Sequence, residues 1–193
     1  MVFYWQGRLP IYDTDGFVNK FFESALPELR AHAIRFVGRA LGDEENTVPS
    51  EIGERLRLLW EHRLAAASNS ETAEERVELV DFGWWFVSRK FDAAWSIDQL
   101  HKGLSLAGWA EPDHEVVEQL DALATQFPLK AIQCLTLMVD GDKNGWGISS
   151  WNEHARRILV AARDSTEDRA KEAAKTLINR LAARGIMEFI DLL

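Results

Sequence analysis

The chain has 193 residues, of which 47% are hydrophobic and 27% charged, and this composition excludes a globally disordered protein. Its formal net charge of −9 disfavours nucleic acid as a partner, and its one cysteine, Cys134, excludes an internal disulfide and is typical of a reducing compartment. Because no apolar run approaches the roughly 18 residues of a membrane span and no basic leader begins the chain, we expect a cytoplasmic protein without a membrane partner.

Apolar residues recur at helical spacing along nearly the whole chain, and no segment sustains the alternation typical of strands. We therefore predict an all-α fold. In chain order, the expected helices form four pairs near residues 15–66, 72–108, 112–141 and 149–184, followed by a short apolar tail. We expect residues 1–193 to form a single domain.

Local signals place the ends of the first helices. The acidic cap signal at residues 13–15 precedes the first helix, and Pro27 should bend or split it. Thr72 with Glu75 has the spacing of a capping box for a third helix. On that helix we expect a shared buried face, formed by Val77, Val80, Trp84 and Val87.

The later helices have start and stop signals of the same kind. Asp92 should begin a helix that Gly108 closes, and Pro128 should begin another. Further caps are expected at Ser150 and Ser165, because each is followed three residues later by an acidic residue.

Tight turns recur at residues 91–92, 127–128 and 164–165, about 36 residues apart. This period is typical of arrays in which antiparallel helical hairpins stack on one another. The sequence therefore predicts a HEAT-like array of helical hairpins, and an irregular helical bundle is the alternative.

Aromatic residues concentrate in the middle of the chain, from Phe82 to Trp95. Aromatic side chains bury large apolar areas, so a cluster of this density is typical of a packed core. A ligand or peptide pocket is the alternative interpretation.

The segment from Asp140 to Gly145 matches the first half of a calcium-binding loop, with oxygen ligands at positions 1, 3 and 5 and glycine at position 6. The second half fails, because Trp151 stands where a bidentate Glu is required. An ordinary loop between helices, with Asp, Asn and Gly supporting the turn, is the preferred interpretation. We expect no metal site.

Other catalytic patterns are missing from the sequence. The five histidines are isolated, and no phosphate-binding glycine loop or nucleophile elbow is present. The paired carboxylates fall at expected helix starts, where solvated charges interact favourably with the helix dipole. We therefore predict no catalytic or cofactor-binding residues, no cofactor and no enzymatic activity.

Several specific strings carry a family resemblance, and they lie at residues 32–39, 54–64, 82–86, 90–92 and 145–147, the last together with Trp151. With these strings, most of the chain resembles the C-terminal helical-repeat region of large bacterial multidomain NTPase-like proteins of the signalling or antiviral-defence type. The resemblance implies a helical-repeat tail that follows effector and nucleotide domains, and it implies no active-site residue. This chain departs from the pattern because it contains no nucleotide-binding segment, so it would be the tail alone.

These observations favour a non-enzymatic domain that binds protein, either its own upstream domains or a separate partner. The expected contact points are Trp5, Trp109 and the loop from Gly141 to Gly147. Two alternatives stay open. One is a small metal-assisted hydrolase built on Asp140, Asp142 and His154, and the other is a structural cap that closes a longer array.

Overall fold

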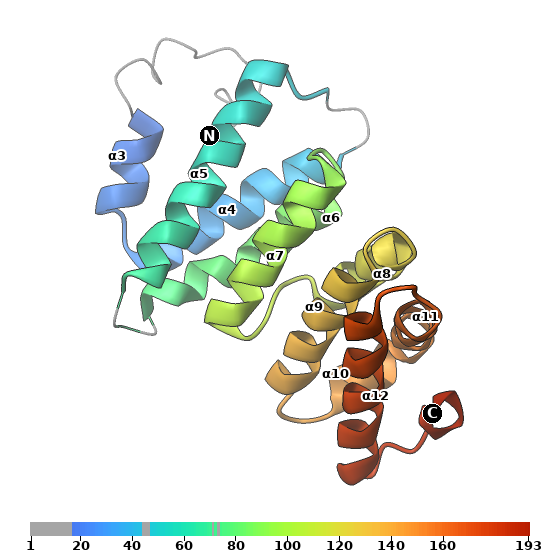
Figure 1. Cartoon of the computed structure of the whole chain (residues 1–193). Coiled ribbons are helices and arrows are strands. Elements are labelled where there is room, and N and C mark those ends of the chain that lie inside the picture. Colours follow the sequence, from blue (N-terminus) through green and yellow to red (C-terminus); the bar gives the residue numbers. More distant parts are fainter. Residues whose placement is uncertain (1–16, 44–46, 71, 73) are drawn as a thin grey trace. The chain divides into compact units, whose positions relative to one another are not determined.

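A computed structural model describes residues 17–43, 47–70, 72 and 74–193 (Figure 1). Every regular element in these residues is a helix, so the predicted all-α class is confirmed. No helix in the described ranges has the length and apolarity needed to cross a membrane. The chain divides into two compact units, Met1–Pro112 (unit 1) and Asp113–Leu193 (unit 2), and the expectation of a single domain stays a prediction.

Unit 1 is built from five α-helices and one 3-10 helix in its described residues: α3 (Phe17–Ser24), α4 (Pro27–Gly42), α5 (Ser50–Ser68), η1 (Glu74–Phe82), α6 (Gly83–Val87) and α7 (Ala93–Ala107). Helix α4 packs against η1 and α6, while α7 packs against η1 and α5. Pro27 separates α3 from α4, as the sequence predicts. The cap signal at residues 13–15 lies outside the described residues, and so does the Glu75 side chain of the capping box.

The third expected helix differs from its prediction. Residues 74–82 form a 3-10 helix, which has three residues per turn in place of 3.6. The expected buried face was therefore wrong: Val77 is 50% exposed, and Trp84 is half-buried. Leu79 and Phe82, one 3-10 turn apart, are buried instead.

Two carboxylates of η1 are buried among arginines. The Glu78 side chain is fully buried and accepts hydrogen bonds from the guanidinium groups of Arg30 and Arg63, at 2.6 Å for Arg63. One 3-10 turn later, buried Asp81 accepts from Arg35 at 2.7 Å. That hydrogen bond, followed by the charge of Asp81, raises the pKa of Arg35. These ion pairs bind η1 to α4 and α5.

The aromatic cluster consists of Trp60, Phe82, Trp85, Phe91 and Trp95. The Trp60 ring stacks on Phe82 with a centroid separation of 5.1 Å and meets Trp85 and Trp95 edge to face. Trp85 is fully buried, and its Nε1 donates to the carbonyl of Ile34 at 2.8 Å. Trp60, Phe82 and Trp85 thus belong to the core of unit 1, as the packed-core interpretation predicted, while Phe91 and Trp95 are half-buried at its edge.

Gly38 sets how closely α4 approaches α6. A Cβ atom at Gly38 would overlap the Cβ of Trp84 and lie 2.9 Å from Cδ1 of Trp85. Only glycine fits there, because the atoms that a side chain would meet belong to a packed core or lie close to the backbone.

Unit 2 is formed by five α-helices and a final 3-10 turn, all within described residues: α8 (Asp113–Ala124), α9 (Pro128–Gly141), α10 (Trp146–Ser150), α11 (Asn152–Arg163), α12 (Asp168–Ala183) and η2 (Ile190–Leu192). Helices α8 and α9 pack together as a hairpin, and so do α11 and α12. The hairpins pack on each other, α8 against α11 and α9 against α12 (Figure 1). The further assignment to a HEAT-like array stays a prediction.

The predicted caps fare unequally. Asp92 accepts from the backbone N–H of Trp95 at 2.8 Å, and Gly108 ends α7 with a φ of +73°, so both signals are confirmed. The Ser150 cap was wrong, because its hydroxyl donates to the carbonyl of Gly147 and the residue ends the extra helix α10. The Ser165 cap was also wrong, because the N-cap of α12 is Glu167, and the Ser165 hydroxyl accepts from the backbone N–H of Glu167.

Candidate functional site

The connection between α9 and α10 forms one wall of a pocket of about 420 Å³. Its apolar part is provided by three buried side chains: Val139, Ile148 and Leu181. Its polar part includes the exposed side chains of Lys143, Asn144 and Arg184. The pocket therefore combines apolar side chains with polar groups of both charges, because Asp140 and Asp142 also line it.

Both aspartates of this loop are engaged by groups of the chain. Asp140 accepts from Arg180 at 2.8 Å through each carboxylate oxygen, and from Arg184 at 3.4 Å. Oδ2 of Asp142 accepts from the backbone N–H of Ile148 at 3.0 Å. Gly145 allows the chain to turn there, because its φ of +71° is rarely adopted by other residues. The acidic residues thus hold the loop in place.

The calcium-like pattern does not produce a cluster of ligands. Among the described residues, no group of three or more His, Cys, Asp or Glu side chains could hold a metal ion. The hydrolase alternative combines His154 with Asp140 and Asp142, but the contacts of His154 are with different residues. Its Nδ1 lies 2.9 Å from Oδ2 of Asp121, which also accepts from Arg157 at 2.7 Å.

Trp146 is the most exposed large apolar side chain of the described residues, at 80%. It is the first residue of α10, directly after Gly145 of the pocket wall. Met187, which is 61% exposed, likewise follows a pocket residue, Ile186. Two residues that line the pocket, on segments distant in sequence, are thus each followed in the chain by an exposed apolar residue.

Helix α10 is fixed by the residue that follows it. Trp151 is fully buried, and its Nε1 donates to Oδ2 of Asp113 on α8 at 3.1 Å. Gly147 lies so close to the Trp151 indole that a Cβ atom would overlap the ring. Because these contacts immobilise the backbone next to it, Trp146 is presented to solvent from a rigid position.

The C-terminal tail carries more exposed apolar surface, at Ile190 and Leu193. Phe189 buries its ring in unit 2, and Arg156 donates to both carboxylate oxygens of Asp191 at 2.8 and 3.1 Å. The hydrogen bond from Arg156 lowers the pKa of Asp191. One exposed ion pair thus helps to position the tail.

We expect acid to weaken the attachment of this tail, which the buried Phe189 also holds. A carboxyl whose folded-state pKa is depressed contributes stability above its unfolded pKa of about 3.9, and that contribution is lost as the pH falls through the folded value. The Met187 and Ile190 methyl NMR signals should therefore shift toward unfolded positions as the pH falls below about 4. Asp191→Asn should cause the same shifts at neutral pH.

Asp164→Asn is the matched control. The pKa of Asp164 is also lowered, chiefly by a hydrogen bond from Arg163, but that partner is its immediate neighbour in the chain. The Met187 and Ile190 signals should not respond to this change. Unchanged signals in Asp191→Asn would show that the ion pair does not position the tail.

The other expected contact points have different outcomes. Trp5 lies outside the described residues. Trp109 is half-buried, and its Nε1 donates to Glu111 at 3.0 Å, so it is not a free surface ring. Sequence reasoning named the loop from Gly141 to Gly147 but not Trp146 as its exposed residue. The sequence contained one signal for the exposure of Trp146, because this tryptophan lies outside the apolar stripes of the neighbouring helices.

No protein-family model matches the chain, and no curated protein or solved structure is significantly similar to it. The geometry of the chain is therefore the basis for a functional proposal.

Proposed function

We propose that the chain is a non-enzymatic helical domain that binds protein through the surface around Trp146. The observation that carries the proposal is the 80% exposure of Trp146 on an anchored helix beside a pocket with a mixed polar and apolar lining. Exposed apolar groups rimmed by polar residues mark interaction sites. Tryptophan is also among the residues most enriched at the centres of protein interfaces.

The surrounding residues support a peptide or protein partner over a reaction. The carboxylates of Asp140 and Asp142 are held by donors of the chain, and His154 is paired with Asp121. These contacts give no support to the metal-assisted hydrolase. A partner would bury Trp146, and the pocket walled by the neighbouring loop would accept one of its side chains.

The resemblance to helical tails of bacterial NTPase-like proteins supplies two kinds of partner. In the first case, the Trp146 surface contacts upstream effector or nucleotide domains of the same protein. In the second, it contacts a separate protein, and the tail acts as a sensor in signalling or defence. The alternative is a structural cap that closes a longer array. In that case the same surface would be in permanent contact with the adjacent repeat of the array.

Trp146→Ser should abolish most of the binding. We would select a displayed library of random peptides on the full chain and measure the affinities of the enriched peptides. Loss of a central tryptophan costs an interface about 2 kcal/mol or more, so binding should weaken about 30-fold. The free energy of unfolding should change by less than about 0.5 kcal/mol, because the side chain is exposed.

Leu58→Ser is the matched control, since Leu58 is 56% exposed on α5 in the other unit. This variant should bind the selected peptides as the original chain does. The proposal fails when no peptide is enriched, or when the enriched peptides bind the Trp146 and Leu58 variants equally well.

A further inference from the structure

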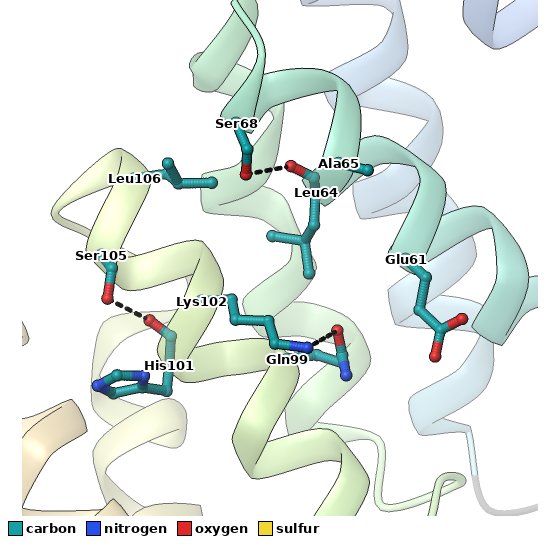
Figure 2. Close-up of a pocket in the computed structure, with 9 residues that line it drawn as sticks. All are labelled: Glu61, Leu64, Ala65, Ser68, Gln99, His101, Lys102, Ser105 and Leu106. Atoms are coloured by element: carbon teal, nitrogen blue, oxygen red, sulfur yellow. Dashed lines mark hydrogen bonds between the residues drawn. The ribbon is translucent and has the colours of Figure 1, made fainter.

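A second cavity, of about 610 Å³, is a groove between α5 and α7 of unit 1 (Figure 2). Residues on one face of each helix line it, with Leu64 and Ala65 on α5 and Gln99, Lys102 and Leu106 on α7. Gly103 of α7 faces Leu64 of α5, since a Cβ atom at this position would lie in van der Waals contact with Cδ2 of Leu64, at 3.8 Å. The volume is that of a site for a small molecule.

The inner part of the groove holds an amide with unused donors. Gln99 is only 4% exposed, and Nζ of Lys102 donates to its Oε1 at 3.5 Å. An ammonium group can only donate, so the amide oxygen must face Lys102 and the NH₂ group must point elsewhere. Among the described residues that NH₂ group has no side-chain or backbone acceptor, and it is not one of the atoms buried from solvent, so it is available to a molecule in the groove. Figure 2 shows the contact between Gln99 and Lys102.

Lys102 is also incompletely engaged. Its ammonium has no carboxylate partner among the residues that the structure describes, and the bond to Gln99 uses one of its three donors. Its remaining donors are open to solvent, because Lys102 is exposed. Two neighbouring donors, one of them charged, match the two acceptor oxygens of a carboxylate.

The other residues of the groove determine which kind of group could be attached to that carboxylate. Leu64, which is 4% exposed, and the side chains of Ala65 and Leu106 offer apolar contacts. Glu61 lies at the edge of the groove, where its Oε1 accepts from Nε1 of Trp95 at 2.8 Å. Its negative charge disfavours a second anionic group on the ligand.

We propose that this groove binds a small aliphatic monocarboxylate. The carboxylate accepts hydrogen bonds from the Gln99 amide and the Lys102 ammonium, and the hydrocarbon chain lies against Leu64, Ala65 and Leu106. This site is separate from the Trp146 surface and does not depend on the function proposed for it.

The test is an NMR titration of the full chain with sodium hexanoate, which follows the Gln99 side-chain amide and the Leu64 methyl signals. Saturable shifts of both groups are expected. Because the charge-assisted hydrogen bonds are lost, Lys102→Met and Gln99→Leu should each weaken binding about tenfold. Lys102 is exposed, so its variant should fold normally even if Gln99→Leu is destabilised.

Lys175→Met is the charge-matched control, because Lys175 is an exposed lysine of α12 in unit 2. It should bind hexanoate as the original chain does, while 1-hexanol and hexylamine should leave the Gln99 amide signals unshifted. The proposal is overturned by an absence of saturable shifts, by unchanged affinity in Lys102→Met, or by hexylamine binding as tightly as hexanoate. It is also overturned if a dipeptide with a free C-terminal carboxylate binds the groove and hexanoate does not.

Discussion

Glu78→Leu is expected to destabilise unit 1 by about 3–5 kcal/mol, because it removes the buried carboxylate to which two buried arginines donate. Arg30 and Arg63 both donate to the Glu78 carboxylate, and each is 4% exposed. Water therefore cannot replace the lost partner. Urea unfolding, monitored by hydrogen exchange at the amides of α4, would measure the decrease in the free energy of unfolding of unit 1.

Two further variants separate the ion cluster from general packing. Replacing all three members, as Arg30→Met, Glu78→Leu and Arg63→Met together, should restore at least about 2 kcal/mol relative to Glu78→Leu, since no unpaired charge is left. Glu51→Gln breaks an exposed pair with Arg55 and should cost less than about 1 kcal/mol. A triple variant less stable than Glu78→Leu would contradict this account of the cluster.

Trp60→Ala should cost unit 1 about 3–5 kcal/mol, as expected for removing a buried tryptophan. Trp60 is 1% exposed and contacts four other rings of the aromatic cluster. The cavity would lie between η1, α5 and α7, so it cannot be filled by moving one side chain. Urea unfolding followed by near-ultraviolet circular dichroism would measure the change.

Trp60→Phe should be clearly milder than Trp60→Ala. It keeps an aromatic ring against Phe82, and it removes the indole N–H, which is buried without a hydrogen-bond partner in the described residues. Trp146→Ala, at an 80% exposed position, should change the stability by less than about 0.5 kcal/mol. Equal losses in the two Trp60 variants would show that ring packing does not hold this core together.

The features that sequence reasoning predicted well have local causes. Pro27 cannot continue the ladder of α3, Asp92 caps the helix that follows it, and Gly108 adopts a positive φ at the end of α7. Each of these outcomes depends on one residue and its immediate neighbours. The helical class follows in the same way from apolar periodicity.

The features that were missed depend on distant residues. Glu78 and Asp81 are buried because Arg30, Arg35 and Arg63 reach them from other helices, 15 to 48 positions away. A buried carboxylate leaves no pattern in the neighbouring sequence. The expected buried face assumed 3.6 residues per turn and therefore included Val77, which is exposed. The groove between α5 and α7 was missed for a related reason, since it requires knowing that these two helices are neighbours.

The placement of Glu78 and Asp81 has a consequence for how this protein can vary. The two carboxylates are three residues apart, which is one turn of a 3-10 helix, and both must face arginines held on other elements. An insertion or deletion of one residue between them would rotate one carboxylate by about 120° away from its partner. Relatives of this protein should therefore keep the length of residues 74–82 constant.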